Sequence, residues 1–194
     1  RVKNAAGLGL ESVGLSPDDL DGRLDLGNGW LYAVGDVSGG PQLTHWGKYQ
    51  ARMIGPVIAA RATGQPEPDG AASGPLPHVV FTSPQVAQVG PTAEEARKDH
   101  PDLIVIDRPL TSAAGYALLR DDASGQARLL IAVDRVIGAT FVGQEVSELL
   151  HAATIAIASG ASVASLKHAV PAYPTASEIW LRLLDGAFSA LTGD

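Results

Sequence analysis

Residues 127–143, ARLLIAVDRVIGATFVG, contain two apolar runs separated by the charged pair Asp134 and Arg135. Each run is about as long as a typical strand and is rich in aliphatic and β-branched residues. The two runs therefore predict β-strands at residues 127–134 and 136–143. Three further segments have the same apolar character and length and predict the other strands, which are residues 78–82, 103–110 and 115–121.

Helical periodicity takes over after Gly143. An apolar stripe at offsets 0, 3, 4, 7 and 11 is formed by Val146, Leu149, Leu150, Ala153 and Ile157. That spacing places the five side chains on one face of a helix. Residues 162–170 predict a further helical turn or two, and residues 177–188 predict a final helix whose inward side chains are Ile179, Leu183 and Leu184. Strands followed by helices predict an α+β fold, an antiparallel sheet covered by helices.

A stretch rich in Pro, Gly and Ala at residues 64–76 predicts a linker. It divides the chain into residues 1–63 and residues 77–194. In the first part, residues 30–40 predict a short buried strand that ends in a Gly-rich turn. Residues 44–61 then predict a helix, with one apolar face formed by Ile54, Val57 and Ile58.

Composition excludes several classes of protein. A net charge of −7 argues against nucleic acid as a partner, because phosphate backbones are bound by clustered Lys and Arg. No apolar run reaches the roughly 20 residues that cross a bilayer, and no signal peptide is visible, so we expect no membrane association. The chain has no cysteine, which excludes disulfides and thiolate chemistry within it. The sequence predicts a soluble cytoplasmic protein.

Two features suggest further chemistry but do not predict a site. The stretch GLGLESVG at residues 7–14 lacks the third glycine of the dinucleotide fingerprint, because Ser12 occupies that position, and no strand precedes it. A loop that turns on glycine is the better interpretation. The five histidines have no helical pairing at i, i+3 or i, i+4, so we expect no metal site.

Four motifs in order resemble one enzyme family. Residues 31–52, LYAVGDVSGGPQLTHWGKYQAR, resemble the second flavin-contacting segment of the pyridine nucleotide-disulfide oxidoreductases, which include dihydrolipoamide dehydrogenase and mercuric reductase. Residues 77–97 resemble the Phe-Thr-x-Pro signature that opens the family's dimerisation domain. Residues 136–166 resemble its strand-to-helix passage, and residues 173–178, YPTASE, fall where the family has His-Pro-Thr-x-Ser-Glu.

The resemblance implies a set of flavin contacts. Gly35 and Asp36 match the family's Gly-Asp pair, in which the carboxylate accepts a hydrogen bond from a ribityl hydroxyl of FAD. The helix that follows would direct its first N–H groups and its positive dipole end at the flavin ring. The residues implicated at that helix end are Gln42, Leu43, Thr44 and His45. For His45 the backbone N–H, more than the ring, is implicated.

The resemblance also implies catalytic positions. Tyr173 occupies the place of the family's acid/base His, and Glu178 occupies that of its carboxylate partner. Tyrosine hydroxyls stay protonated at neutral pH, so Tyr173 is suited to donate a hydrogen bond but not to act as a resting base. A plainer interpretation stays open for each residue. For Tyr173 it is packing of the ring at a dimer interface. For Glu178 it is capping alone, at the helix that begins with Thr175.

Other departures from the family pattern concern neighbouring motifs. Gln85 replaces the usual Glu, and the Thr that normally opens the Gly-Asp motif is absent from residues 26–30. The chain also starts without Met at Arg1. Together with the resemblance, that start predicts a fragment from the C-terminal part of a longer enzyme, with the tail of an FAD/NAD-binding α/β domain at residues 1–63.

The functional expectation is a flavin-dependent oxidoreductase. It would pass hydride from NAD(P)H through FAD to a disulfide or a small-molecule acceptor, and this chain would supply a homodimer interface and part of the FAD site. The stripe from Val146 to Ile157 and the final helix are expected to supply the dimer surface. Two alternatives remain: an NAD(P)H:quinone-type flavoprotein without redox cysteines, and a catalytically inactive dimerisation module. By itself the fragment is expected neither to hold FAD firmly nor to oxidise NAD(P)H.

Overall fold

The computed structural model describes residues 3–27 and 29–193. The chain forms two compact units, Arg1–Ser73 and Gly74–Asp194, and each is described by itself. Within the described residues, no helix is both long enough and apolar enough to cross a membrane.

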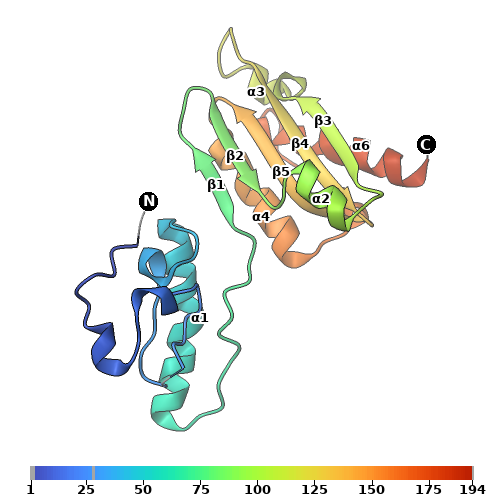
Figure 1. Cartoon of the computed structure of the whole chain (residues 1–194). Coiled ribbons are helices and arrows are strands. Elements are labelled where there is room, and N and C mark those ends of the chain that lie inside the picture. The colour runs from blue at the N-terminus through green and yellow to red at the C-terminus, as the bar shows by residue number, and fades with distance from the viewer. Residues whose placement is uncertain (1–2, 28, 194) are drawn as a thin grey trace. The chain divides into compact units, whose positions relative to one another are not determined.

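The second unit is built on a five-stranded antiparallel sheet with strand order β1-β2-β5-β4-β3 (Figure 1). The strands are β1 (Pro77–Val80), β2 (Gln85–Val89), β3 (Ile104–Pro109), β4 (Gly125–Ala132) and β5 (Arg135–Gly143). The two apolar runs at residues 127–134 and 136–143 are therefore β4 and β5, neighbours joined by a tight hairpin. The antiparallel sheet with helices confirms the predicted fold class.

Helices cover one face of this sheet along its length. Residues Val146–Leu149 form a 3₁₀ turn, η5, that continues into α4 (Leu150–Ser159), and a second 3₁₀ turn, η6 (Ala176–Glu178), continues into α6 (Ile179–Thr192). Both helices pack on the alternate strand residues that form the core, which include Ala87, Leu129 and Phe141. The short helix α2 (Ala93–Asp99) lies over the opposite face (Figure 1). A single turn, α5 (Val163–Leu166), follows α4.

The apolar stripe from Val146 to Ile157 packs into the core of its own unit. Val146 and Ala153 are fully buried in this unit, and so are Ile179 and Leu183. The expectation that these residues supply a dimer surface is wrong, because the inward faces of α4 and α6 pack against the sheet of the same unit. Any surface for a second copy must come from other side chains.

Two strand assignments differ from the prediction. Residues 115–121 do not form a strand, because α3 (Ala114–Ala117) turns the chain across the end of the sheet. The Tyr116 hydroxyl fixes this turn by contacting the Ser124 carbonyl at 3.0 Å and accepting the Gln144 N–H at 2.8 Å. In contrast, β2 was not predicted, because two Gln residues interrupt its short apolar pattern. Ala87 and Val89 are buried on one face, and Val86 and Gln88 are half-buried on the other.

Among its described residues the first unit has a single long helix, α1 (Thr44–Thr63), which confirms the predicted helix. Three 3₁₀ turns, η1 (Leu10–Val13), η2 (Pro17–Asp19) and η3 (Gly35–Ser38), surround a small separate core. The strand predicted at residues 30–40 is wrong within the described residues, where only the Asp25–Tyr32 bridge forms a ladder contact. Of the predicted inward face, Ile54 and Val57 are buried, but Ile58 points outward and is 38% exposed.

Candidate functional site

The Gly35–Asp36 turn is fastened to the first turns of α1. The Gly35 N–H donates to the buried Gln50 Oε1 at 2.8 Å, and the Ser38 hydroxyl donates to the Gly35 carbonyl at 2.8 Å. Gly35 has a φ of +73°, a conformation that glycine adopts without strain. A Cβ added to Gly47 would lie 2.8 Å from the Gly35 Cα, so the two backbones touch. This close contact holds the exposed Asp36 beside α1.

The N-terminus of α1 has an apolar N-cap residue. The N-cap residue is Leu43, which is extended and makes no side-chain capping hydrogen bond. Thr44 and His45 begin the helix with exposed side chains, whereas Gln42 and Leu43 are half-buried. An N-terminus of this kind favours a ligand atom carrying negative charge. The predicted flavin-contacting residues are therefore grouped around one end of α1, and they fit the group that the resemblance implies.

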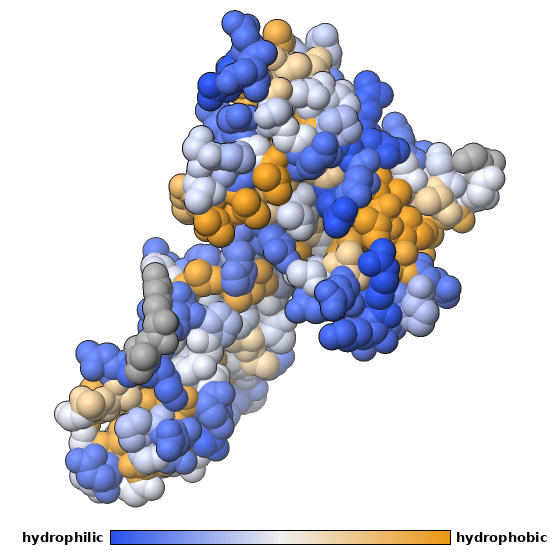
Figure 2. Space-filling view, turned by 45° about the horizontal axis from the view of Figure 1, so that its top comes forward, coloured by the Kyte–Doolittle hydropathy of each residue, from blue (hydrophilic) through white to orange (hydrophobic). Residues whose placement is uncertain are grey.

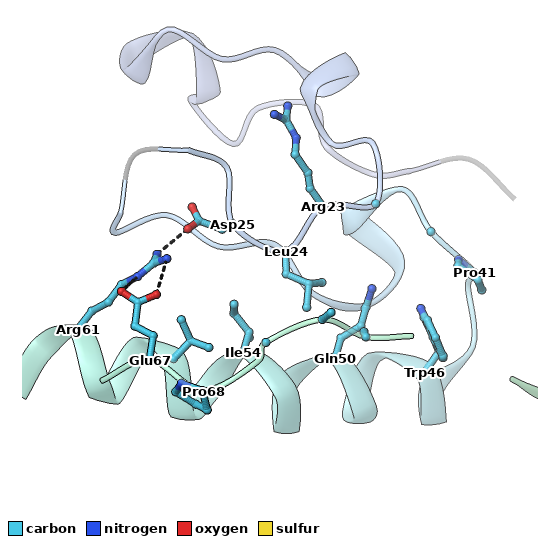
Figure 3. Close-up of a pocket in the computed structure, with 16 residues that line it drawn as sticks. Arg23, Leu24, Asp25, Pro41, Trp46, Gln50, Ile54, Arg61, Glu67 and Pro68 are labelled. Atoms are coloured by element: carbon cyan, nitrogen blue, oxygen red, sulfur yellow. Dashed lines mark hydrogen bonds and ion pairs between the residues drawn. The ribbon is translucent and has the colours of Figure 1, made fainter. Parts of the chain in front are cut away.

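A cavity of about 540 Å³ lies along the same helix (Figure 3). Trp46, Gln50, Ile54 and Arg61 of α1 line one wall of it. Arg23 lies on the facing segment, and its guanidinium points away from α1 and pairs with Asp21. Residues 67–72, which the composition assigned to a linker, run along this cavity and pack on α1.

Arg61 ties three segments of the first unit together. Its guanidinium forms an ion pair with Asp25, donates to the Tyr32 hydroxyl at 2.8 Å, and pairs with both Glu67 oxygens at 2.9 and 3.0 Å. These hydrogen bonds from Arg61 lower the pKa of Asp25, with help from the Gly27 N–H, and also lower the pKa of Glu67. All three charged side chains are partly exposed, so solvent weakens each pair.

The first unit is expected to lose stability in acid through these pairs. Because both carboxyl pKa values are lowered on folding, their stabilisation is complete at neutral pH and disappears as the pH falls through the lowered values, below about 4. Arg61→Met should flatten this dependence and leave a less stable unit at pH 7. Urea unfolding of both proteins across pH 2–7 measures it. Parallel pH profiles would contradict the role of Arg61.

The second group of predicted residues lies at one end of the sheet in the other unit. The Glu178 carboxylate accepts the N–H of Thr175 and the N–H of Gly115, each at 3.3 Å. A Cβ added to Gly115 would lie 2.2 to 2.4 Å from the Thr175 backbone. Glu178 thus fastens the segment that carries Tyr173 to the start of α3. Tyr173 itself is 78% exposed.

Sequence reasoning missed the residues that hold these sites in place. The sequence predicts no role for Gln50, Gly47 or Gly115, since their importance comes from contacts that span 12 to 63 positions of sequence. For Gly47 the available signal was a glycine in the first turns of a predicted helix, where alanine is the favoured residue. Among the described residues no group of three or more His, Asp or Glu side chains is arranged to bind a metal ion.

Comparison with known proteins agrees with the fold and the motifs. Residues 76–183 match the family described as the pyridine nucleotide-disulphide oxidoreductase, dimerisation domain. A dihydrolipoyl dehydrogenase of Thermus scotoductus is 35% identical over 185 residues, which are 92% of this chain and 38% of that protein. The mitochondrial dihydrolipoyl dehydrogenase of Dictyostelium discoideum is 33% identical over 92% of this chain and 36% of its own length.

Solved structures give the same result. LpdA of Mycobacterium tuberculosis superposes with a TM-score of 0.76 at 26% identity, over 95% of this chain and 40% of that one. The flavoprotein disulfide reductase RclA of Escherichia coli superposes with a TM-score of 0.69 at 22% identity, over 79% of this chain and 35% of that one, and shares the fold. The chain belongs to the pyridine nucleotide-disulphide oxidoreductase family. It spans less than two fifths of the length of the two curated relatives.

Proposed function

We propose that this chain works as the dimerisation domain and a flavin-contacting segment of a flavin-dependent NAD(P)H oxidoreductase. In such an enzyme hydride passes from NAD(P)H through FAD to a disulfide or a small-molecule acceptor, and two copies form the active dimer. The observation that carries the proposal is the contact between Gly35 and Gly47. It holds a carboxylate, Asp36, beside the N-terminus of α1 in a chain of this family.

The residues of this chain would hold the cofactor at its sugar and ring. The Asp36 carboxylate would accept a hydrogen bond from a hydroxyl of the FAD ribityl chain. The backbone N–H groups at Thr44 and His45, with Gln42 and Leu43 beside them, would face the ring edge where negative charge grows on reduction. FAD, when bound, supplies the hydride-accepting chemistry. The protein supplies position and a favourable electrostatic field.

The Tyr173 segment would serve the acceptor. Its hydroxyl can donate a hydrogen bond to a thiolate, to reduced flavin or to an acceptor oxygen. Glu178 is engaged with two backbone N–H groups, so its role is to position the segment that carries Tyr173. This arrangement supports an acceptor that needs a hydrogen-bond donor more than a resting base.

The test uses the full gene product that carries this chain. It should purify with about one FAD per chain and oxidise NADH or NADPH. Asp36→Ala should lose flavin on gel filtration, while Asp69→Ala, in the linker, should keep it. A colourless wild-type protein that oxidises neither NADH nor NADPH would contradict the proposed function.

Substitution of Tyr173 distinguishes its two interpretations. Tyr173→Phe keeps the ring and removes the hydroxyl. If the hydroxyl donates to the acceptor, kcat should fall by roughly 10-fold or more, the size expected for one lost transition-state hydrogen bond. Compared with the Phe variant, Tyr173→His should recover turnover with disulfide acceptors, and this turnover should depend on pH near neutrality. Turnover by the Phe variant equal to wild type with every acceptor would leave only the packing role.

A further inference from the structure

The cavity along α1 lies apart from the residues proposed to contact flavin. Its lining comes from residues 22–25, from Gly40 and Pro41, from α1, and from residues 67–72, all within the first unit. Asp36 and residues 42–45 do not line it. The cavity is therefore a second candidate site, and it does not depend on the proposed function.

One end of the cavity has two nitrogen donors beside an open space. A Cβ added to Gly40 would lie 3.8 Å from Trp46 Nε1 and 3.9 Å from Gln50 Nε2. Apart from Gly40 and its chain neighbours, no other heavy atom of the described residues would lie within 4 Å of it. In Figure 3 both nitrogens are at the ends of side chains that point away from the α1 ribbon. Because both atoms carry N–H groups, this space favours an oxygen that accepts hydrogen bonds.

The orientation of the Gln50 amide is fixed by its own contacts. The side chain is buried, and its Oε1 accepts the Gly35 N–H at 2.8 Å. An N–H group can donate only to the amide oxygen, so Nε2 must lie on the other side. The contact of Nε2 with the Ser38 hydroxyl is long, 3.4 Å, and an amide nitrogen carries two hydrogens. At least one buried N–H of Gln50 thus remains for a ligand, and leaving it without an acceptor is unfavourable.

The middle of the cavity is apolar. Leu24, Ile54, Val57 and Pro68 line it, and both Ile54 and Val57 are buried. A Cβ added to Gly70 would meet the Val57 Cγ2 methyl at 2.8 Å, so the backbone there is already packed on this apolar floor. An apolar ligand body is stabilised by such a lining.

The charges at the far end of the cavity are balanced. Two cations, Arg23 and Arg61, and two carboxylates, Asp25 and Glu67, line it. Arg61 pairs with both carboxylates, and Arg23 pairs with Asp21. A charged ligand would lose its hydration without gaining an unpaired partner. The lining therefore favours a neutral ligand.

Size and shape favour an elongated small molecule. Trp46 and Arg61 are 15 positions apart on α1, which corresponds to about 22 Å of helix. The volume of about 540 Å³ falls within the roughly 300–1,000 Å³ of small-molecule sites. On the face of the first unit seen in Figure 2, apolar residues form small areas among polar ones, whereas a protein partner would need a larger apolar patch.

We propose that this cavity binds a neutral, elongated small molecule through a carbonyl oxygen. The oxygen lies beside Gly40 and accepts hydrogen bonds from Trp46 Nε1 and Gln50 Nε2. The apolar body of the molecule packs along α1 on Ile54 and Val57. This site goes beyond the proposed function, because it binds its ligand without any of the residues that would hold FAD.

Nuclear magnetic resonance of the ¹⁵N-labelled chain tests the proposal directly. The chain has three tryptophans and therefore three indole N–H signals, and Trp46→Phe identifies the one from Trp46. The probe is 4-phenylbutan-2-one, a neutral ketone with a phenyl ring at its other end. It should shift the Trp46 signal with saturation and a dissociation constant on the order of 1 mM, as expected for a ligand of this size. The amine 4-phenylbutylamine carries an ammonium group instead of the carbonyl and should not shift this signal.

Two variants and a matched control locate the site. The methyl group of Gly40→Ala makes only ordinary contacts with both nitrogens, so the chain should fold, yet it occupies the space of the ligand oxygen. Gln50→Glu keeps an acceptor for the Gly35 N–H and replaces the N–H donor by a second oxygen. Each should raise the dissociation constant at least about 10-fold, the size expected when a ligand hydrogen bond is lost. Gly55→Ala, in the same helix, should bind like wild type.

The unshifted signals in each spectrum verify that the variants fold. A Trp46 signal that stays fixed at every soluble concentration of the ketone would overturn the proposal. Binding of the amine as tight as that of the ketone, or of the ketone to Gly40→Ala as tight as to wild type, would also overturn it.

Discussion

Gly115→Ala is expected to lower the free energy of unfolding of the sheet unit by about 2 kcal/mol or more, at the upper part of the range for overpacking. The new Cβ would meet three backbone atoms of Thr175 at 2.2 to 2.4 Å, and backbone cannot rotate away as a side chain can. The substitution would also break the hydrogen bond from the Gly115 N–H to Glu178. Equilibrium urea unfolding measures the loss.

A second glycine provides the control. Gly186 lies inside α6, where an added Cβ would meet the end of the flexible Arg108 side chain at 2.5 Å and the Ile106 Cγ2 methyl at 3.1 Å. Gly186→Ala should therefore cost much less than Gly115→Ala, since the Arg108 side chain can move and alanine is favoured over glycine in a helix by up to about 1 kcal/mol. In the full gene product, Gly115→Ala should also reduce turnover by displacing Tyr173. Equal stability of the two variants would show that the contact between α3 and the Tyr173 segment is not rigid.

Gly47→Ala is expected to detach the Gly35–Asp36 turn from α1. The new Cβ would lie 2.8 Å from the Gly35 Cα, so the turn must move and stretch the 2.8 Å hydrogen bond to Gln50. The free energy of unfolding of the first unit should therefore fall by about 1–3 kcal/mol. Hydrogen exchange of the α1 amides measures it in this chain, and the flavin content after gel filtration measures its consequence in the full gene product.

The control for this substitution lies in the same helix. Gly55 has no heavy atom within 4 Å of an added Cβ, so Gly55→Ala should leave flavin content unchanged and should not speed exchange of the α1 amides, since alanine is favoured over glycine in a helix. The outcome that contradicts the role of Gly47 is a Gly47→Ala protein that keeps its flavin and exchanges like wild type.

The sequence predicted the elements whose pattern is local. Strands β4 and β5 follow from two apolar runs of strand length, and helix α1 and the inward stripe of α4 follow from helical periodicity. The strand expected at residues 115–121 failed for a non-local reason. Tyr116 is an aromatic residue of a kind common in strands, yet its hydroxyl is held by Ser124 and Gln144. Burial raises the pKa of this hydroxyl and keeps it a neutral donor.

The sequence predicted some residues of the candidate site and missed others for the same reason. Asp36, Tyr173 and Glu178 were found because they stand in short motifs that resemble a family. The residues that fix them were not found, because Gln50 contacts Gly35 and Gly115 contacts Glu178 only after folding. The α4 stripe was predicted as one face of a helix, but its partner was not. The folded unit shows that the sheet covers this face.

The strand order has a consequence for how the second unit assembles. Strands β3, β4 and β5 follow one another in the chain and in the sheet, so they can form from local contacts. The β1–β2 hairpin is made earlier in the sequence, yet β2 pairs with β5, as in the contact of Gln85 with Gly143. Closing that loop of about 58 residues carries an entropy cost that the local strands do not have. During synthesis the β2 edge of the first hairpin therefore stays unpaired until β5 has left the ribosome.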